Sequence, residues 1–171
     1  MTTCSILITD TGPLKTLAYA GGLDLLLATK LPLVVTDMAY TELSFRKDLD
    51  RNKTALLFID REIKTGRLEI IHTGTPENAN SLRSMRVDPV EHSIKIALED
   101  YYKNNPESHA LLLFEDSDIA KKTFVLPDNV SLLTTGAFLL EMEKIGHIQS
   151  AEDMLKKVEQ RHPGAKDTGP Y

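Results

Sequence analysis

The chain has 171 residues, a formal net charge of −5, and 26% charged and 42% hydrophobic residues. This composition is typical of an ordinary globular protein, and no apolar run reaches the roughly 18 residues that a membrane span needs. The single cysteine, Cys4, excludes an internal disulfide framework and a zinc site built from cysteines alone. The negative net charge argues against a surface that binds nucleic acid everywhere, but it leaves room for a local basic rim.

The two ends of the sequence suggest a location and a domain boundary. The N-terminus lacks the basic start and apolar core of a signal peptide, so we expect a cytoplasmic protein with no membrane partner. A chain of this length is most simply one domain with a core that needs no disulfide or structural metal. We expect that domain over residues 1–160 and a flexible tail over residues 161–171, a segment that contains two Pro and two Gly.

The first predicted element is a buried strand over residues 5–9 that ends on Asp10. A short aliphatic run stopped by Gly12 and Pro13 fits a strand better than a helix, which needs more length. In open α/β sheets, ligands collect beyond the carboxyl ends of the strands. Asp10 is therefore a candidate site residue.

Apolar residues at helical spacing alternate with short apolar runs along the next part of the chain. They predict helices over residues 14–20 and 23–28, a strand over 33–35, a helix capped by Thr36 and Asp37 that carries Glu42, a charged linker over 46–53, a helix over 55–63, a strand over 68–72 and a loop over 73–86.

The clearest helix start in the sequence is Asp88-Pro89-Val90-Glu91. It combines an Asp N-cap, a proline at the first helical position and a glutamate at the third, and it predicts a helix to about residue 104. On a helical wheel Glu91 lies at the border of the apolar stripe. Glu91 can therefore face inward as well as cap the helix.

A second strand that ends on acids lies over residues 110–114 and is followed by Glu115, Asp116 and Asp118. The remaining pattern predicts a strand over residues 130–133, a helix that begins at 134–136 and ends at 146, and a final helix over 150–160. Short apolar strands that alternate with helices predict a mostly parallel sheet covered on both faces, which is a three-layer α/β/α architecture.

Several acids are expected at strand ends or early in helices, which is more than a purely structural sheet requires. Carboxylates about 4 Å apart repel unless a cation or a proton lies among them. Oxygen ligands without His or Cys select hard cations, so Mg²⁺ or Mn²⁺ is the natural occupant. Such an ion polarises a phosphoryl oxygen and activates a water. The chemistry suggested is hydrolysis of a phosphodiester.

Taken together, these motifs resemble those of the PIN-domain nucleases, and within them the bacterial and archaeal branch that includes many toxin-like proteins. The resemblance extends from Ile6 to about Val158. Its marks are Ile8-Thr9-Asp10-Thr11-Gly12-Pro13-Leu14, Val35-Thr36 to Glu42-Leu43, Asp88-Pro89-Val90-Glu91, Leu113-Phe114-Glu115-Asp116, and Thr135 to Gly146 followed by His147-Ile148.

The resemblance implies a five-stranded sheet of order 3-2-1-4-5, which places strands one and four side by side. It implies a metal-dependent endoribonuclease, often a homodimer and often silenced by an antitoxin protein. The residues that match the catalytic and metal-binding acids of the family are Asp10, Glu42, Glu91 and Asp116. Thr11 and Thr135 match hydroxyl groups that orient a ligand, a water or the substrate phosphate.

Two departures from the family pattern leave alternatives open. Related sequences usually have a glycine before the third acid where this chain has Val90, so the third acid is Glu91 or Asp88. Relatives commonly show two aspartates after strand four where this chain has Glu115-Asp116. A catalytically degenerate PIN-like module that binds RNA or protein is the alternative function.

Other residues have a structural interpretation beside the functional one. Asp88 and Glu91 fit a capping box, and Thr135 fits a helix N-cap. Aspartate-nucleophile phosphatases also begin with a strand-end Asp, but they need a second Asp where this chain has Gly12. A set of basic residues is expected to be either an RNA-contacting rim or ordinary solvated charge, namely Arg46, Lys47, Arg51, Lys53, Lys121 and Lys122.

Overall fold

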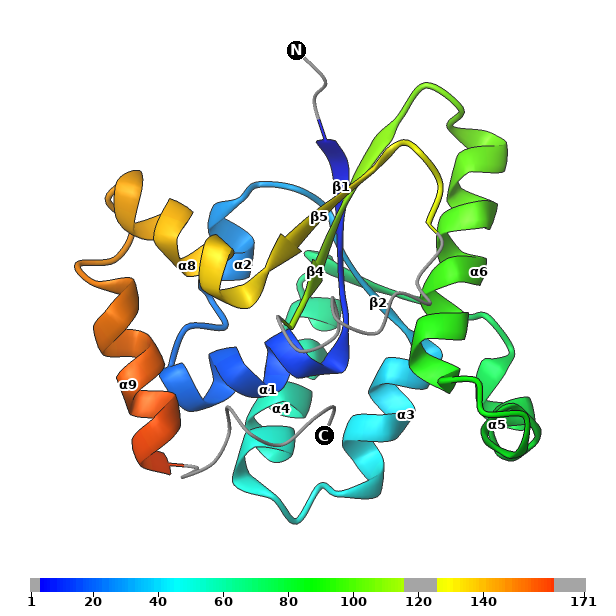
Figure 1. Ribbon diagram of the computed structural model, residues 1–171, viewed down its shortest axis with the longest axis horizontal. Coiled ribbons are helices and arrows are strands. Elements are labelled where there is room, and N and C mark those ends of the chain that lie inside the picture. Colours follow the sequence, from blue (N-terminus) through cyan, green and yellow to red (C-terminus); the bar gives the residue numbers. More distant parts are fainter. Residues whose placement is uncertain (1–3, 116–125, 162–171) are drawn as a thin grey trace.

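The computed structural model describes residues 4–115 and 126–161 (Figure 1). In these residues five strands form one parallel sheet of order β3-β2-β1-β4-β5, which confirms the predicted topology. The strands are β1 Cys4–Thr9, β2 Leu33–Thr36, β3 Leu68–Ile71, β4 His109–Phe114 and β5 Val130–Thr134.

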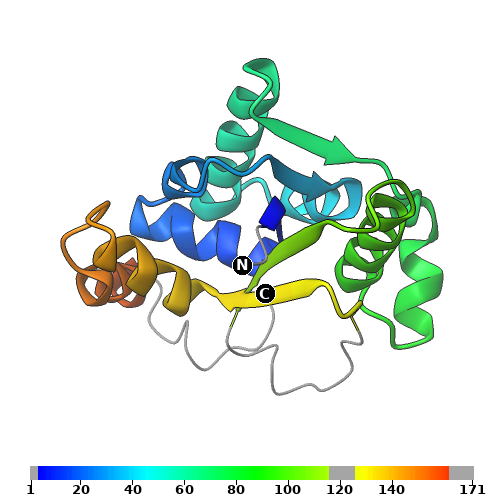
Figure 2. The same ribbon diagram turned by 90° about the horizontal axis from the view of Figure 1, so that it is seen from above.

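Helices cover both faces of this sheet, which gives the three-layer α/β/α fold (Figures 1 and 2). In Figure 1, α8 and α9 lie on one side of the sheet and α6 lies on the other. The helices are α1 Thr11–Ala20, α2 Leu25–Ala28, α3 Asp37–Phe45, α4 Asp50–Lys64, α5 Thr75–Ser84, α6 Pro89–Asn104, α8 Thr135–Lys144 and α9 Ala151–Arg161. None of the helices in the described part of the chain is long and apolar enough to cross a membrane.

The central strand β1 is buried on both of its faces. Ile6, Leu7 and Ile8 all belong to the core, and Leu7 and Ile8 have no exposed surface. β1 pairs with β2 on one side and with β4 on the other, with Leu7 opposite both Leu33 and Leu111. A parallel strand covered by helices on both faces reads as a continuous aliphatic run, which is why the sequence signal for β1 is strong.

The carboxyl ends of the strands and the first turns of several helices meet at one edge of the sheet. β1, β2 and β5 lead directly into α1, α3 and α8, each capped by the residue that ends or follows the strand. Asp10 caps α1, Thr36 caps α3 and Thr134 caps α8, each through its own side chain. Helix N-termini carry partial positive charge, so this edge favours anionic groups.

The prediction of a loop over residues 73–86 is wrong, because Thr75–Ser84 form helix α5. Gly74 precedes it with φ +71° in the left-handed region, where a side chain would be strained. The turn before the helix is held by another element: the Asp37 carboxylate accepts from the amides of Thr73, at 2.8 Å, and Gly74, at 3.1 Å. The helix buries little apolar surface, so its sequence carries little periodic signal.

The predicted linker over residues 46–53 is too long, because α4 begins at Asp50. Arg51 and Asn52 are buried in its first turn, whereas polar residues of this kind are predicted from the sequence to be exposed. At the other end of the chain, the last helix reaches Arg161 and so includes the first residue of the predicted tail. The rest of that tail lies outside the described residues.

Candidate functional site

Asp10 stands at the junction of β1 and α1. Its backbone amide donates to the carbonyl of Leu113 at 3.1 Å, which ties the end of β1 to the end of β4. Its Oδ1 accepts from the amide of Thr11 at 2.6 Å, so the carboxylate is the N-cap of α1. The predicted strand-end position of Asp10 is therefore observed. Asp10 also has a structural role, because it caps α1.

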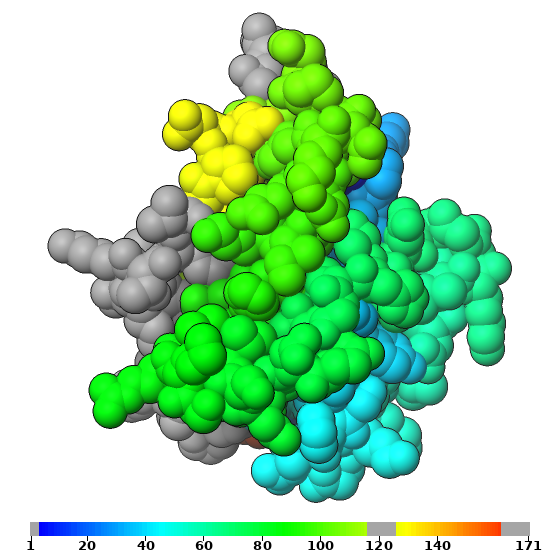
Figure 3. Space-filling model, turned by 90° about the vertical axis from the view of Figure 1, so that its right-hand side faces the viewer, coloured from blue at the N-terminus to red at the C-terminus, as the bar shows by residue number. Residues whose placement is uncertain are grey.

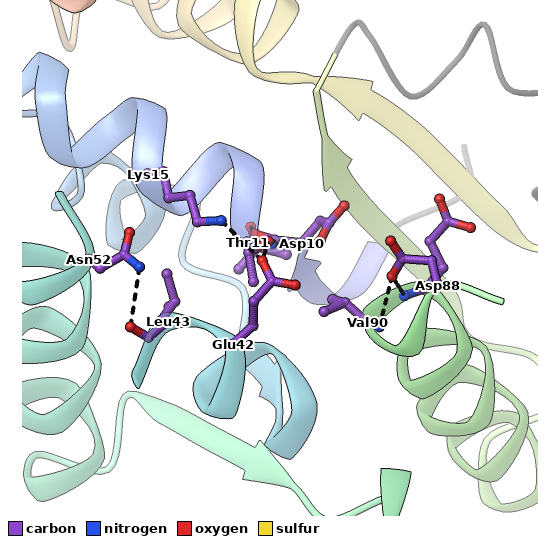
Figure 4. A network of polar contacts seen from close by, with 10 residues as sticks. Asp10, Thr11, Lys15, Glu42, Leu43, Asn52, Asp88 and Val90 are labelled. Atoms are coloured by element: carbon purple, nitrogen blue, oxygen red, sulfur yellow. Dashed lines mark hydrogen bonds and ion pairs between the residues drawn. The ribbon is translucent and has the colours of Figure 1, made fainter. Parts of the chain in front are cut away.

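Glu42 from α3 lies beside the start of α1 (Figure 4). Its Oε1 accepts from the Thr11 hydroxyl at 2.8 Å and from Lys15 Nζ at 3.0 Å. The same Thr11 hydroxyl oxygen lies 3.5 Å from Asp10 Oδ1. Thr11 thus stands between the carboxylates of two separate βα units.

Lys15 is a member of this cluster that the sequence did not reveal. It is 5% exposed, and its ion pair with Glu42 joins α1 to α3. A lysine inside a short amphipathic pattern is ordinarily a surface residue, so no sequence signal marks it for burial. Its ammonium group places positive charge against one of the predicted metal-binding acids.

Asp88 and Glu91 occupy the first turn of α6. Oδ1 of Asp88 accepts from the amides of Val90, at 2.8 Å, and Glu91, at 3.1 Å, so Asp88 is the N-cap as predicted. This cap occupies one carboxylate oxygen of Asp88, just as the cap of α1 occupies one carboxylate oxygen of Asp10. Val90 is 2% exposed, so its side chain packs into the core.

A buried pair of hydroxyl groups fixes α6 against the end of β2. Oγ1 of Thr36 and Oγ of Ser93 are 2.7 Å apart, and both residues are fully buried. The Ser93 hydroxyl also lies 2.7 Å from the carbonyl of Val90 and donates to it. This contact, which the sequence did not single out, places the start of α6 at the same sheet edge as α3.

Thr135 does not cap α8, because Thr134 holds that position. The Thr135 hydroxyl instead donates to Oε1 of Glu115 at 2.9 Å. Glu115 also packs against Gly12: a Cβ built on Gly12 would lie 2.5 Å from Cγ of Glu115. The space beside Gly12 is therefore filled by a side chain. Gly12 itself is part of helix α1, although the helix was predicted to begin at residue 14.

The structure brings three of the predicted site residues together. Asp10, Thr11 and Glu42 form one cluster, and Glu91 lies in the first turn of α6. Asp116 lies outside the described residues, as do Asp118, Lys121 and Lys122. Within residues 4–115 and 126–161, no group of three or more His, Cys, Asp or Glu side chains is placed to hold a metal ion.

The basic residues after α3 do not form one uniform exposed rim. The Arg46 side chain is exposed and lies 3.4 Å from Asp48, as expected of solvated charge. Arg51 is only 9% exposed, and its guanidinium lies 5.7 Å from the centre of the Tyr19 ring. Lys53 is exposed. The expectation of a solvated or rim position is therefore wrong for Arg51, because α4 begins early enough to turn this residue inward.

Comparison with protein-family models, with curated proteins and with solved structures finds no match to this chain. Its function is therefore inferred from the residues at the carboxyl edge of the sheet.

Proposed function

We propose that this protein is a metal-dependent endoribonuclease of the PIN-domain type, with Asp10, Glu42, Glu91 and Asp116 as its metal-binding and catalytic acids. One observation carries the proposal. Thr11 contacts both Asp10 and Glu42, so acids from two βα units converge at the carboxyl edge of a 3-2-1-4-5 sheet. This edge is where open α/β sheets bind their ligands.

The chemistry of these side chains fits Mg²⁺ or Mn²⁺. The cluster offers carboxylate and hydroxyl oxygens without sulfur or imidazole, which is the ligand type that hard cations prefer. When bound, such an ion would activate a water and polarise the scissile phosphoryl group of RNA. Glu91 and Asp116 would complete the set of ligands in this proposal.

The protein's own residues supply orientation and charge. The N-cap bond fixes the Asp10 carboxylate at the start of α1, and the Thr11 hydroxyl holds Glu42 toward it. Lys15 neutralises part of the charge on Glu42 and would offer a cation to a phosphate that approaches this edge. Thr135 acts on Glu115, so any effect of Thr135 on a substrate passes through that side chain.

A second function is favoured by the ion pair between Lys15 and Glu42. An ammonium group 3.0 Å from Glu42 already balances the charge that would attract a metal ion. In that case the fold is a degenerate PIN-like module that binds RNA or a protein without cleaving it. A homodimer and an antitoxin protein are further predictions from the family resemblance, to be tested by light scattering and by co-purification.

RNA cleavage by the purified protein, with Mg²⁺ or Mn²⁺ and with EDTA, separates the two functions. We expect metal-dependent cleavage that falls by at least about a hundredfold in Asp10→Asn. Asp10 would bind the metal ion directly, and the loss of a direct ligand lowers activity more than the loss of a residue that only orients a ligand. Asparagine is as good an N-cap as aspartate, so this variant keeps α1 intact. Asp153→Asn, on the exposed side of α9, is the matched control. Equal cleavage by Asp10→Asn and the wild type would overturn the nuclease assignment.

A further inference from the structure

A pocket of about 380 Å³ opens beside Glu42. Its walls come from four helices: Lys15 belongs to α1, Glu42 to α3, Asn52 to α4 and Arg83 to α5. Figure 3 shows the side of the molecule where α5 and α6, in green, lie above the cyan segment that contains α3. The volume is in the range of pockets that take a small molecule or one unit of a polymer.

The pocket is strongly basic although the protein carries a net negative charge. Lys15, Arg46, Arg51 and Arg83 line it, against Glu42 as the one acid among the described lining residues. Arg46 and Arg83 are exposed, so their guanidinium groups can reach an incoming anion. Arginine binds phosphate oxygens in a bidentate way, which makes phosphate the fitting anion.

A buried amide in the wall adds a hydrogen-bond acceptor. Asn52 is 2% exposed, and its Nδ2 donates to the carbonyl of Leu43 at 3.2 Å, which fixes the orientation of the amide (Figure 4). Oδ1 of Asn52 has no hydrogen-bond partner among the described residues. A buried acceptor without a donor is destabilising, so the pocket favours a ligand that brings a hydroxyl or amine hydrogen.

An aromatic ring stands at the mouth of the pocket. Phe45 lines the pocket and is 72% exposed. Exposure of this apolar ring to water does not stabilise the fold. Exposed aromatic rings beside basic grooves are where unpaired bases stack, because every base has a flat face. The ring, the arginines and the amide offer partners for a base, a phosphate and a hydroxyl group.

We infer that this pocket takes one nucleotide of single-stranded RNA, with the base on Phe45, the phosphate on Arg46 and Arg83, and the ribose 2′-hydroxyl donating to Oδ1 of Asn52. The inference rests on the proposed function, because Glu42 belongs both to the pocket and to the acid cluster. A nucleotide seated here lies next to the acids that would act on the neighbouring phosphate. The 2′-hydroxyl is the group that distinguishes RNA from DNA, so Asn52 would determine sugar specificity.

Binding of short labelled oligonucleotides in EDTA tests the inference without any cleavage. The probes are a single-stranded RNA, the DNA of the same sequence and the 2′-O-methyl form of the RNA, measured by fluorescence anisotropy. We expect the RNA to bind about fivefold to tenfold more tightly than either analogue, since each lacks the donated hydrogen. In Asn52→Ala this preference should vanish, and the ratio of affinities is informative even if the variant is less stable.

Two further variants test the base and phosphate contacts. Phe45→Ala should weaken RNA binding by about tenfold, the effect of losing one stacked base. Arg83→Ala should lower the slope of log Kd against log salt concentration by about 0.7, the value for one contact to a single strand. Leu57→Ala, also exposed but on α4 and outside the pocket, and Lys144→Ala, on α8, are the matched controls and should bind as the wild type does.

The outcomes separate this pocket from the nuclease proposal. Metal-dependent cleavage with equal binding of RNA and DNA, or with no effect of Phe45→Ala and Arg83→Ala, overturns the pocket and leaves the nuclease standing. RNA preference that depends on Asn52, without any cleavage, supports the pocket and overturns the nuclease. Displacement of the RNA by an oligoglutamate peptide, together with equal binding of RNA and DNA, would overturn the pocket in favour of an acidic protein partner.

Discussion

The hydroxyl of Thr11 donates a hydrogen bond to Glu42 at 2.8 Å across 31 positions of sequence. Thr11 is the first residue of α1 and Glu42 lies in α3, so the bond joins the helices that follow the neighbouring strands β1 and β2. Asp10 precedes Thr11 and caps the same helix. The Thr11 hydroxyl therefore lies next to both carboxylates, that of Asp10 before α1 and that of Glu42 in α3. This arrangement is the core of the proposed site.

Thr11→Val should test this relationship with little change of shape. Valine fills the same volume but cannot donate, so the Glu42 carboxylate loses one partner in a partly buried place. We expect a loss of about 1–2 kcal/mol in the free energy of unfolding, measured by urea denaturation, and about tenfold slower RNA cleavage. Thr16→Val, in the same helix but outside the cluster, should change neither quantity by a comparable amount. A fully active Thr11→Val variant would show that Thr11 does not position the acids.

Lys15→Met removes the ammonium group and keeps most of the side-chain volume. The Glu42 carboxylate then lacks its cation partner, and we expect a loss of about 1–3 kcal/mol in the free energy of unfolding. If a metal ion and Lys15 compete for Glu42, Mn²⁺ should raise the melting temperature of Lys15→Met more than that of the wild type, since ligands stabilise the folded state they bind. Lys144→Met, which loses only an exposed pair with Glu141, is the control. An absence of any Mn²⁺ shift in both proteins would favour the binding module.

Gly12→Ala has two opposite effects on the free energy of unfolding. Alanine favours a helix over glycine by about 1 kcal/mol, which would stabilise α1. The new Cβ, however, would lie 2.5 Å from Cγ of Glu115, so that side chain must move and its bond with Thr135 is disturbed. We expect the clash to win, with a net loss of about 1–2 kcal/mol measured by thermal and urea unfolding.

The double variant Gly12→Ala/Glu115→Ala provides the check on this expectation. With the Glu115 side chain removed, the added methyl group meets no obstacle there, and Gly12→Ala should become neutral or stabilising in that background. The same destabilisation with and without Glu115 would mean that the clash is not the cause.

The alkaline limb of the stability curve should depend on Tyr40. Burial, and then the hydrogen bond and negative charge of Asp60, raise the pKa of Tyr40 above its ordinary value of 10.0, with the two oxygens 3.0 Å apart. The folded state thus favours the neutral phenol. The stability that this group contributes is fully present below its unfolded pKa and is lost as the pH rises through the raised pKa.

Urea unfolding across the alkaline range measures this effect. The wild type should lose stability above about pH 10, and Tyr40→Phe should lose it less steeply, because phenylalanine cannot ionise. A shallower slope should remain in the variant, since burial also raises the pKa of Tyr102. Identical slopes for the variant and the wild type would contradict the assignment to Tyr40.

The sequence alone determined the framework of this protein. β1 and β4 are short aliphatic runs buried on both faces, and α6 begins at the N-cap Asp88 as predicted. These signals are local, because an aliphatic run and a helix cap are each formed by residues that lie close together in the chain. The order of the strands followed from the family resemblance, and the structure confirms it.

Only the tertiary structure decided the groups that meet across elements. The turn before α5 is held by Asp37 from α3, and Arg51 and Asn52 are buried in the first turn of α4. Lys15 is buried because Glu42 is placed beside it by a different strand and helix. A polar side chain is exposed by default and becomes a site residue only when a distant partner compensates for the loss of water. That partner is set by the packing of the sheet and its helices.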